Sequence, residues 1–220
     1  GGTAMKNAIV FDLDGTLWDS VPACTASWSR VLAGDPRALG ATLTEPQMRS
    51  YMGKTELEIA HLMLPGVDDE TDHEIMQACT RAEYDYLRSE GGATLFPGVA
   101  ETVRMLCRSY DLYIVSNCQP GYIELFLDFS RLNDCFAGHT CAGTTGLDKG
   151  GSIRLLLDSV GNPSAFYLGD TDGDERATRK AGIPFVHAAY GFGHAVQPDD
   201  SISSFSQLPA AAQRLFAKNA

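Results

Sequence analysis

The chain has 220 residues, of which 44% are hydrophobic and 20% charged, and its formal net charge is −11. A chain of this length forms one large domain or a core with a small insertion. The acidic balance disfavours nucleic acid and anionic membranes as partners. The longest apolar runs have the length of β-strands and fall well short of the roughly 20 residues that a bilayer span needs. If the substrate is an anion, the negative electrostatic potential of the protein would repel it, and a bound cation is the simplest way to reverse that potential locally.

The start of the chain and the spacing of its cysteines indicate the cellular compartment in which the protein is expected. The segment Gly1–Ala4 precedes Met5, which has the form of a natural start, and we interpret that segment as an expression scar. No basic-then-apolar leader follows, so secretion is not expected. None of the six cysteines lies in a C-x-x-C pair, which favours reduced thiols. These features predict a cytoplasmic protein.

Short apolar runs alternate along the chain with segments of helical periodicity. The runs are Asn7–Phe11, Leu112–Ser116, Ala165–Leu168 and Pro184–Ala188. The helical segments are Val99–Ser109, Gly121–Leu127, Gly150–Val160, Asp172–Ala181 and the closing Ser206–Ala217. Runs that are apolar on both faces are typical of central strands in a parallel sheet covered by helices. The alternation predicts an α/β fold with a doubly wound, mostly parallel Rossmann-like sheet in a three-layer α/β/α arrangement.

One region interrupts this alternation. Between Asp19 and about Gly92 there is no strand-like run. Helix-start signals occur there instead, at Ser20 before Pro22, Thr44 with Gln47, Thr55 with Glu58 and Thr71 with Glu74. The last three have the spacing of a capping box. We therefore expect a helical insertion over residues 19–92, carried by a core of residues 5–18 and 93–220.

The first predicted strand ends in acidic residues. Asp12 and Asp14 follow it directly, and Gly15 and Thr16 come next. Carboxylates at one strand end repel each other, and a cation beside them removes that cost. Gly15 allows a sharp turn, and Thr16 offers a hydroxyl group there. A solvent-exposed Asp-Gly turn is the alternative.

A second acidic group follows the run Ala165–Leu168. Asp170 ends that strand, and Asp172 and Asp174 lie at the start of the next helical segment. Because ligands of such sheets bind outside the carboxyl ends of the strands, we expect Asp170 to meet Asp12 there. Oxygen ligands without thiolates favour Mg²⁺. For Asp172, a carboxylate that only complements the helix dipole is the alternative.

Two further segments carry polar side chains at similar places. Ser116 and Asn117 end a third apolar run, and Ser116 can donate a hydrogen bond to a phosphoryl oxygen. Lys149 stands just before a helical segment, where its charge and the free helix N–H groups suit a phosphate. A solvated surface lysine is the alternative for Lys149. The sequence assigns no role to Cys118 or to the histidines.

Together, these segments resemble the haloacid dehalogenase-like hydrolase superfamily. The residues that carry the resemblance are Asp12-Leu13-Asp14-Gly15-Thr16, Ser116-Asn117, Lys149, and Gly169-Asp170 with Asp174, which match the family's four motifs in order. The resemblance spans Met5 to about Gly193, and the helical insertion matches the family's small helical cap. Three finer segments are similar to the phosphoglycolate phosphatase-like branch: Trp18-Asp19-Ser20, Phe96-Pro97-Gly98-Val99 and Ala189-Tyr190-Gly191-Phe192-Gly193.

The resemblance implies catalytic roles for two aspartates. Asp12 would be the nucleophile that forms an aspartyl-phosphate, and Asp14 would protonate the leaving oxygen and later activate water. Asp14 would contribute only its backbone carbonyl to the metal. Asp12 and Asp170 would bind Mg²⁺ directly, and Asp174 would bind it directly or through water.

The resemblance also implies residues that bind the substrate. Asp12, Thr16, Ser116, Asn117 and Lys149 would surround the transferring phosphoryl group, as the family pattern has it. Arg49 and Lys54, in the predicted cap, would contact the rest of the substrate. Ordinary surface charges are the alternative for those two residues.

The implied function is that of a Mg²⁺-dependent phosphatase acting on a small phosphorylated metabolite, either phosphoglycolate-like or a sugar phosphate. We expect a monomer or homodimer with no nucleic-acid or membrane partner.

The motif residues also bear on alternative activities within the family. Asp14 argues against a dehalogenase and a phosphonate-cleaving enzyme. Thr16 and Cys24 disfavour a β-phosphoglucomutase-like phosphotransferase, which typically has Val and a cap histidine there, without excluding it. Inorganic pyrophosphatase activity is a further alternative that the sequence leaves open. A non-catalytic protein that binds phosphorylated metabolites is disfavoured because every motif residue is present.

Overall fold

The computed structural model describes residues 5–218, so the segment interpreted as an expression scar lies outside the described residues. The chain divides into two compact units. One unit contains the chain up to Trp18 and again from Leu95 onward, and the other is Asp19–Thr94. The chain passes between the units within two short strands, β2 (Trp18–Asp19) and β3 (Thr94–Leu95), which form a two-stranded sheet.

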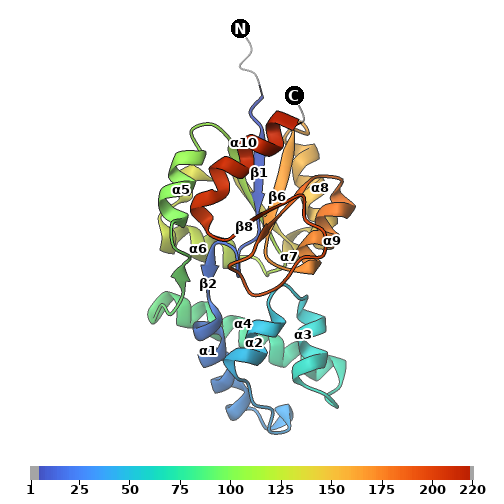
Figure 1. The fold of residues 1–220 in the computed structure, drawn as a ribbon. Coiled ribbons are helices and arrows are strands. Elements are labelled where there is room, and N and C mark those ends of the chain that lie inside the picture. Colours follow the sequence, from blue (N-terminus) through green and yellow to red (C-terminus); the bar gives the residue numbers. More distant parts are fainter. Residues whose placement is uncertain (1–4, 219–220) are drawn as a thin grey trace. The chain divides into compact units, whose positions relative to one another are not determined.

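The first unit is built on a six-stranded sheet with the strand order β5-β4-β1-β6-β7-β8 (Figure 1). Its strands are β1 (Ala8–Phe11), β4 (Asp111–Ser116), β5 (Gly138–Cys141), β6 (Ala165–Gly169), β7 (Phe185–Ala188) and β8 (Asp200–Ile202). Every neighbouring pair in this sheet is parallel. The predicted doubly wound α/β sheet is therefore confirmed.

The strand order places β1 where the chain reverses its direction of travel across the sheet. β1 pairs with β4 on one side and with β6 on the other, so that Phe11 lies opposite both Ile114 and Leu168. All four residues of β1 are fully buried. In doubly wound sheets this reversal opens a crevice at the carboxyl ends of the strands. Asp12 is the first residue beyond that end of β1.

Helices cover both faces of the sheet. They are α5 (Val99–Leu106), α6 (Tyr122–Ser130), α7 (Ala142–Thr145), α8 (Lys149–Ser159), α9 (Asp172–Ala181) and α10 (Leu208–Lys218), with the short 3₁₀ turns η2 (Asn133–Cys135) and η3 (Phe205–Gln207). On one face, Val10 and Tyr167 share a buried cluster with Ile153 of α8. On the other face, the ring of Phe11 stacks 6.0 Å from that of Phe205. The three-layer arrangement follows from these two cores (Figure 1).

The predicted strands differ from the observed sheet at its edges. The four predicted runs correspond to β1, β4, β6 and β7, each within one residue at either end. The edge strands β5 and β8 were not predicted, because their sequences, Gly138–Cys141 and Asp200–Ile202, are short and partly polar. An edge strand has only one neighbour and is partly exposed, so it does not need the continuous apolar run that marks a central strand.

The second unit is helical. Its helices are α1 (Val21–Gly34), α2 (Glu45–Tyr51), α3 (Glu56–Met63) and α4 (Asp69–Ser89), with the 3₁₀ turn η1 (Pro36–Ala38). α1 packs against α4, where the indole N–H of Trp28 donates a 2.7 Å hydrogen bond to the buried carboxylate of Glu83. No helix in the described part of the chain combines the length and apolarity that crossing a bilayer requires.

The helix starts of this unit test the capping predictions. Thr44 and Thr55 form the predicted capping boxes of α2 and α3 with Gln47 and Glu58, so both predictions are confirmed. The prediction that Thr71 starts a helix is wrong. Asp68 caps α4 instead, and its carboxylate accepts a 3.0 Å hydrogen bond from the backbone N–H of Thr71. The helix begins earlier because Asp68 is itself a strong N-cap residue three positions before Thr71.

The start of α1 differs from the prediction in a smaller way. Ser20 occupies the N-cap position, but its side chain makes no capping hydrogen bond. The carboxylate of Asp19 accepts a 3.0 Å hydrogen bond from the N–H of Val21 instead. An aspartate one residue earlier thus satisfies one of the helix's unpaired donors.

Candidate active site

Residues from four separate segments meet at the carboxyl ends of β1 and β6. Asp12 follows β1, Asp170 follows β6, Asp174 lies in the first turn of α9 and Lys149 is the first residue of α8. The carboxylates of Asp12, Asp170 and Asp174 each offer an oxygen within 4.8 Å of the others. The ammonium of Lys149 lies 3.1 Å from Asp12 Oδ1 and 2.5 Å from Asp174 Oδ1. We call these four residues the carboxylate–lysine cluster.

The sheet register explains why Asp12 and Asp170 come together. Because Phe11 lies opposite Leu168, the residues that follow the two strands leave the sheet side by side. The backbone N–H of Asp12 extends the ladder with a 2.9 Å hydrogen bond to the carbonyl of Leu168. Both aspartates are buried, Asp12 at 3% exposure and Asp170 at 0%.

Asp170 is held by groups on both sides. Its Oδ2 accepts a 2.9 Å hydrogen bond from the N–H of Phe192, and its Oδ1 accepts one of 3.3 Å from the hydroxyl of Thr16. Gly15 has a φ of +83°, and a β-carbon there would lie 2.2 Å from Asp170 Oδ2. A β-carbon at Gly191 would lie 2.3 Å from the Asp170 side chain. Only glycine at both positions leaves room for this carboxylate.

Asp174 serves two structural purposes. With Thr171 it forms the capping box of α9, and its Oδ2 accepts hydrogen bonds from the N–H groups of Asp170 (3.0 Å) and Thr171 (3.1 Å). Its Oδ1 accepts the hydrogen bond from Lys149. The helix start thus fixes the carboxylate that pairs with the lysine. Asp172, by contrast, lies outside the cluster and pairs with Arg176 at 2.5 Å.

The charges of the cluster do not balance, because one ammonium faces three buried carboxylates. Burial, and then the negative charge of Asp174, raise the pKa of Asp12 well above its ordinary value. The same two causes raise the pKa of Asp170 to about 7. Burial alone would raise the pKa of Asp174, but the ammonium of Lys149 lowers it. Burial alone would lower the pKa of Lys149, but Asp12 and Asp174 raise it.

Asp14 is partly buried and is not a member of this cluster. Its Oδ1 accepts a 2.9 Å hydrogen bond from the indole N–H of Trp18 and one of 2.8 Å from the hydroxyl of Tyr122. The sequence analysis did not assign Tyr122 to the site. Its position in the first turn of α6, shortly after the carboxyl end of β4, is the signal that was available for it.

The remaining predicted phosphate ligands lie at the same edge of the sheet. Thr16 contacts Asp170, Ser116 is the last residue of β4, the neighbour of β1, and Asn117 follows it. His187, to which the sequence assigned no role, places its Nε2 3.1 Å from the backbone oxygen of Asp170. Arg49 and Lys54 lie in the other compact unit of the chain. They are exposed side chains of the helical unit, where Arg49 lies 3.9 Å from Asp19.

Cys118 follows the end of β4 and interacts with a second thiol. The hydrogen bond with Cys141, and then burial, raise the pKa of Cys118 well above its ordinary value. The same hydrogen bond lowers the pKa of Cys141 to about 6, although burial opposes that shift. All six cysteines are free thiols.

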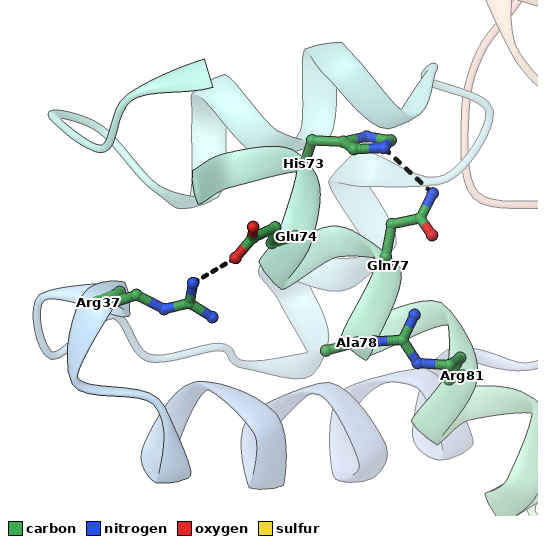
Figure 2. Close-up of a pocket in the computed structure, with 6 residues that line it drawn as sticks. All are labelled: Arg37, His73, Glu74, Gln77, Ala78 and Arg81. Carbon is green, nitrogen blue, oxygen red and sulfur yellow. Dashed lines mark hydrogen bonds and ion pairs between the residues drawn. The ribbon is translucent and has the colours of Figure 1, made fainter. Parts of the chain in front are cut away.

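The helical unit contains a separate, open pocket of about 320 Å³ (Figure 2). It is lined by Arg37, His73, Glu74, Gln77, Ala78 and Arg81. The guanidinium of Arg37 is engaged by Glu74 and by Asp35, at 2.8 Å from the latter. None of the lining residues is among those predicted for catalysis.

Comparison with known proteins identifies the family of the chain. The model of the haloacid dehalogenase-like hydrolase family matches residues 9–188. A phosphoglycolate phosphatase from Synechococcus elongatus is 32% identical over 191 residues, which cover 84% of each chain. A phosphoglycolate phosphatase from Pseudomonas savastanoi pv. phaseolicola is 27% identical over 86% of this chain and 72% of its own.

Solved structures show the same fold. A haloacid dehalogenase-like hydrolase from Streptococcus pneumoniae superposes with a TM-score of 0.79 at 23% identity, over 95% of this chain and 99% of its own. The family model and these relatives identify the protein as a hydrolase of the α/β fold class. The chain belongs to the haloacid dehalogenase-like hydrolase family, in its phosphoglycolate phosphatase-like branch. It is a phosphoric monoester hydrolase.

The buried ion pairs of Lys149 give a stability prediction. Lys149→Met leaves three buried carboxylates without their cation, so we expect chelator-treated protein to lose about 3–5 kcal/mol of unfolding free energy. Lys180→Met is the control, because Lys180 pairs with Asp148 on the surface, where side-chain exposures are 62% and 58%. That change should cost about 1 kcal/mol or less. Urea unfolding at neutral pH measures both, and equal losses would contradict the account.

Proposed function

We propose that this protein is a Mg²⁺-dependent phosphatase that cleaves a small phosphorylated metabolite through an aspartyl-phosphate on Asp12. The observation that carries the proposal is the carboxylate–lysine cluster, in which Asp12 lies beside an ammonium and two further carboxylates. The motif residues Asp12, Asp14, Lys149 and Asp170 support it, since they match the family pattern.

The composition of the cluster fits a divalent cation. Three carboxylates and one ammonium leave an excess of negative charge in a buried place, and every available donor is oxygen. Hard oxygen donors suit Mg²⁺. Asp12 and Asp170 would hold the ion directly, Asp174 directly or through water, and Asp14 through its backbone carbonyl. The bound ion supplies charge neutralisation, which allows an anionic phosphoryl group to approach Asp12.

The chemistry then starts at Asp12. Its carboxylate oxygen attacks phosphorus, a new bond forms between that oxygen and phosphorus, and the bond to the ester oxygen breaks. The ammonium of Lys149 stabilises the charge on the transferring group and keeps the carboxylate oriented. Ser116 and Asn117, at the end of β4, are candidates to donate hydrogen bonds to its oxygens. Thr16 would join them by turning its hydroxyl away from Asp170, to which it donates in this structure.

Asp14 moves the protons. Its carboxyl group gives a proton to the leaving oxygen, and its carboxylate then takes a proton from the water that attacks the aspartyl-phosphate. The hydrogen bonds from Trp18 and Tyr122 support this role, because they fix the orientation of a side chain that is not a member of the carboxylate–lysine cluster. Inorganic phosphate and free Asp12 are the products of the second step.

The helical unit is proposed to be a cap, with residues 19–92 inserted into a catalytic core of residues 5–18 and 93–220. Within it, Arg49 and Lys54 are candidates to contact the part of the substrate that is not phosphoryl. The names of the relatives support a phosphoglycolate-like substrate, which carries a second anionic group. A sugar phosphate is the other member of the proposed substrate class.

The nucleophile is tested with an aryl phosphate and Mg²⁺. Asp12→Asn should reduce kcat about a thousandfold or more, because no carboxylate remains to attack phosphorus. Asp14→Asn, the matched variant two residues away, should reduce kcat by about 10²–10⁴-fold. It should also accumulate covalent phosphate on Asp12, visible by mass spectrometry after acid quench. Wild-type turnover in Asp12→Asn would refute the proposal.

The pH dependence of Mg²⁺ binding follows from Asp170. Its pKa of about 7 means that the folded protein retains a proton that the unfolded chain loses near pH 4. Mg²⁺ must displace this proton, so its affinity should fall by up to about tenfold for each pH unit below 7. The rise in Tm caused by MgCl₂ should therefore be larger at about pH 8 than at about pH 5. If subsaturating Mg²⁺ raised Tm equally at the two pH values, the predicted direction of the pH dependence would be contradicted.

The proposed role of Lys54 predicts a difference between substrates. Lys54→Ala should raise KM for a phosphate ester with a second anionic group by roughly tenfold, because a charge-assisted contact is lost. KM for an aryl phosphate that carries no anionic group besides the phosphoryl group should change little, which makes this second substrate the control. Steady-state kinetics measures KM for both substrates. An equal change in KM for the two would show that Lys54 does not select the substrate.

A further inference from the structure

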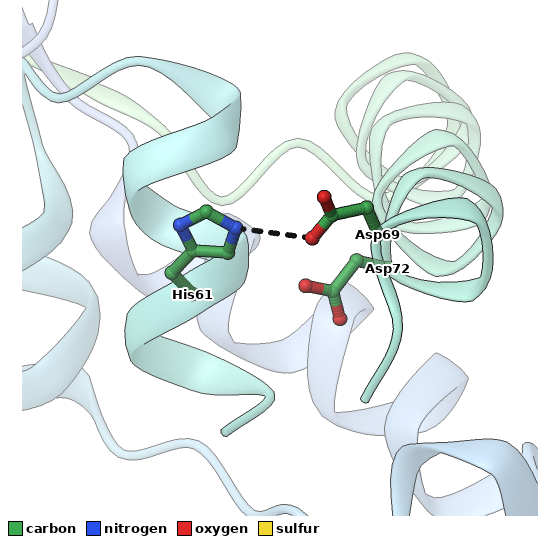
Figure 3. A group of neighbouring side chains, drawn as sticks. All are labelled: His61, Asp69 and Asp72. Carbon is green, nitrogen blue, oxygen red and sulfur yellow. Dashed lines mark hydrogen bonds and ion pairs between the residues drawn. The ribbon is translucent and has the colours of Figure 1, made fainter. Parts of the chain in front are cut away.

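A second group of metal-ligating side chains lies within the helical unit, at the turn between α3 and α4. His61 is in the last turn of α3, and Asp69 and Asp72 are in the first turn of α4. Each offers a donor atom within 4.8 Å of the others, and His61 Nε2 lies 3.4 Å from Asp69 Oδ1. Figure 3 shows the two carboxylates extending from α4 toward the imidazole on α3.

Asp72 distinguishes this group from an ordinary acidic helix start. Its exposure is 2%, and neither of its carboxylate oxygens has a hydrogen-bond partner among residues 5–218. A buried carboxylate without a partner is costly, and such groups are rare unless a ligand, ion or water satisfies them. The side chain therefore lacks the partner that its burial demands.

The helix dipole does not account for Asp72. The positive end of α4 is already complemented by Asp68, whose carboxylate accepts the N–H of Thr71 at 3.0 Å. Asp174 at the start of α9 likewise uses its carboxylate to accept backbone N–H groups. Asp72 accepts none. Burial raises its pKa, but a proton there would only replace an unpaired acceptor with an unpaired O–H donor.

We propose that His61, Asp69 and Asp72 form a second cation site, which takes a divalent transition-metal ion of the zinc type. One imidazole nitrogen and two carboxylate oxygens make a mixed donor set that suits Zn²⁺, whereas Mg²⁺ prefers oxygen alone. The side chains of His61 and Asp69 are 55% and 89% exposed, so an ion can enter from solvent and keep water in its remaining positions.

Such an ion would join α3 to α4. The two helices are connected by a short turn, and the ligands come from both sides of it. Ions that bind only the folded arrangement stabilise it by mass action. The site involves no residue of the carboxylate–lysine cluster, so it goes beyond the phosphatase activity and stands or falls separately from it.

The test uses the protein with saturating MgCl₂ and one equivalent of ZnCl₂. Long-range ¹H–¹⁵N spectra of the histidine rings should show the His61 nitrogen signals shifting, while those of His73 stay in place. His73 is the internal control, because it is also on α4 but contacts Glu56, at 3.4 Å. Signals of His61 that do not respond to stoichiometric Zn²⁺ would overturn the proposal.

Three variants make the test specific. Asp72→Asn and His61→Ala should each weaken Zn²⁺ binding, measured by calorimetry, by about tenfold or more. Glu70→Gln removes an exposed acid from the same turn and should leave the affinity unchanged. If Asp72→Asn does not fold, the exposed His61→Ala carries the comparison. Equal weakening in Glu70→Gln would show general attraction to acidic residues and would contradict a defined site.

Discussion

The site depends on one interaction, the pairing of the Lys149 ammonium with the carboxylates of Asp12 and Asp174. Acidic side chains that are buried this close together repel one another, and the lysine compensates only part of that cost. The remaining negative charge is the reason for proposing that the cluster binds a divalent cation. A carboxylate held beside an ammonium and a cation is also well placed to meet an anionic phosphoryl group. The charges of the proposed catalytic centre would therefore balance only when the metal and the substrate are bound.

The fold supplies the geometry through strand register and helix starts. Parallel pairing of β1 with β6 brings Asp12 and Asp170 to the same end of the sheet, because the two strands end within one residue of each other. The capping box of α9 orients Asp174, and the first residue of α8 provides the lysine. Glycines at positions 15 and 191 leave space for the Asp170 carboxylate. These devices are local, yet each fixes one member of a site assembled from distant parts of the chain.

Sequence patterns predicted the central strands and the acidic residues that follow them, because both are short-range features of an apolar run and its end. They did not predict β5 and β8, whose edge positions require no continuous apolar run. They placed a helix start at Thr71, since Thr71 and Glu74 have the capping-box spacing, whereas Asp68 is the residue that caps α4 in the structure. The contacts of Tyr122 with Asp14 and of the Phe192 amide with Asp170 join residues far apart in sequence, so no local pattern contains them. The unpaired burial of Asp72 is likewise visible only in three dimensions.

The most direct measurement is the position of a cation in crystals of the protein grown with Mn²⁺, located by its anomalous scattering. The account predicts a peak at coordination distance from carboxylate oxygens of both Asp12 and Asp170, with the Lys149 ammonium still beside Asp12. Anomalous density that is absent from this cluster, in crystals where Mn²⁺ is present at saturating concentration, would contradict the claim that these strand ends are built around a divalent ion.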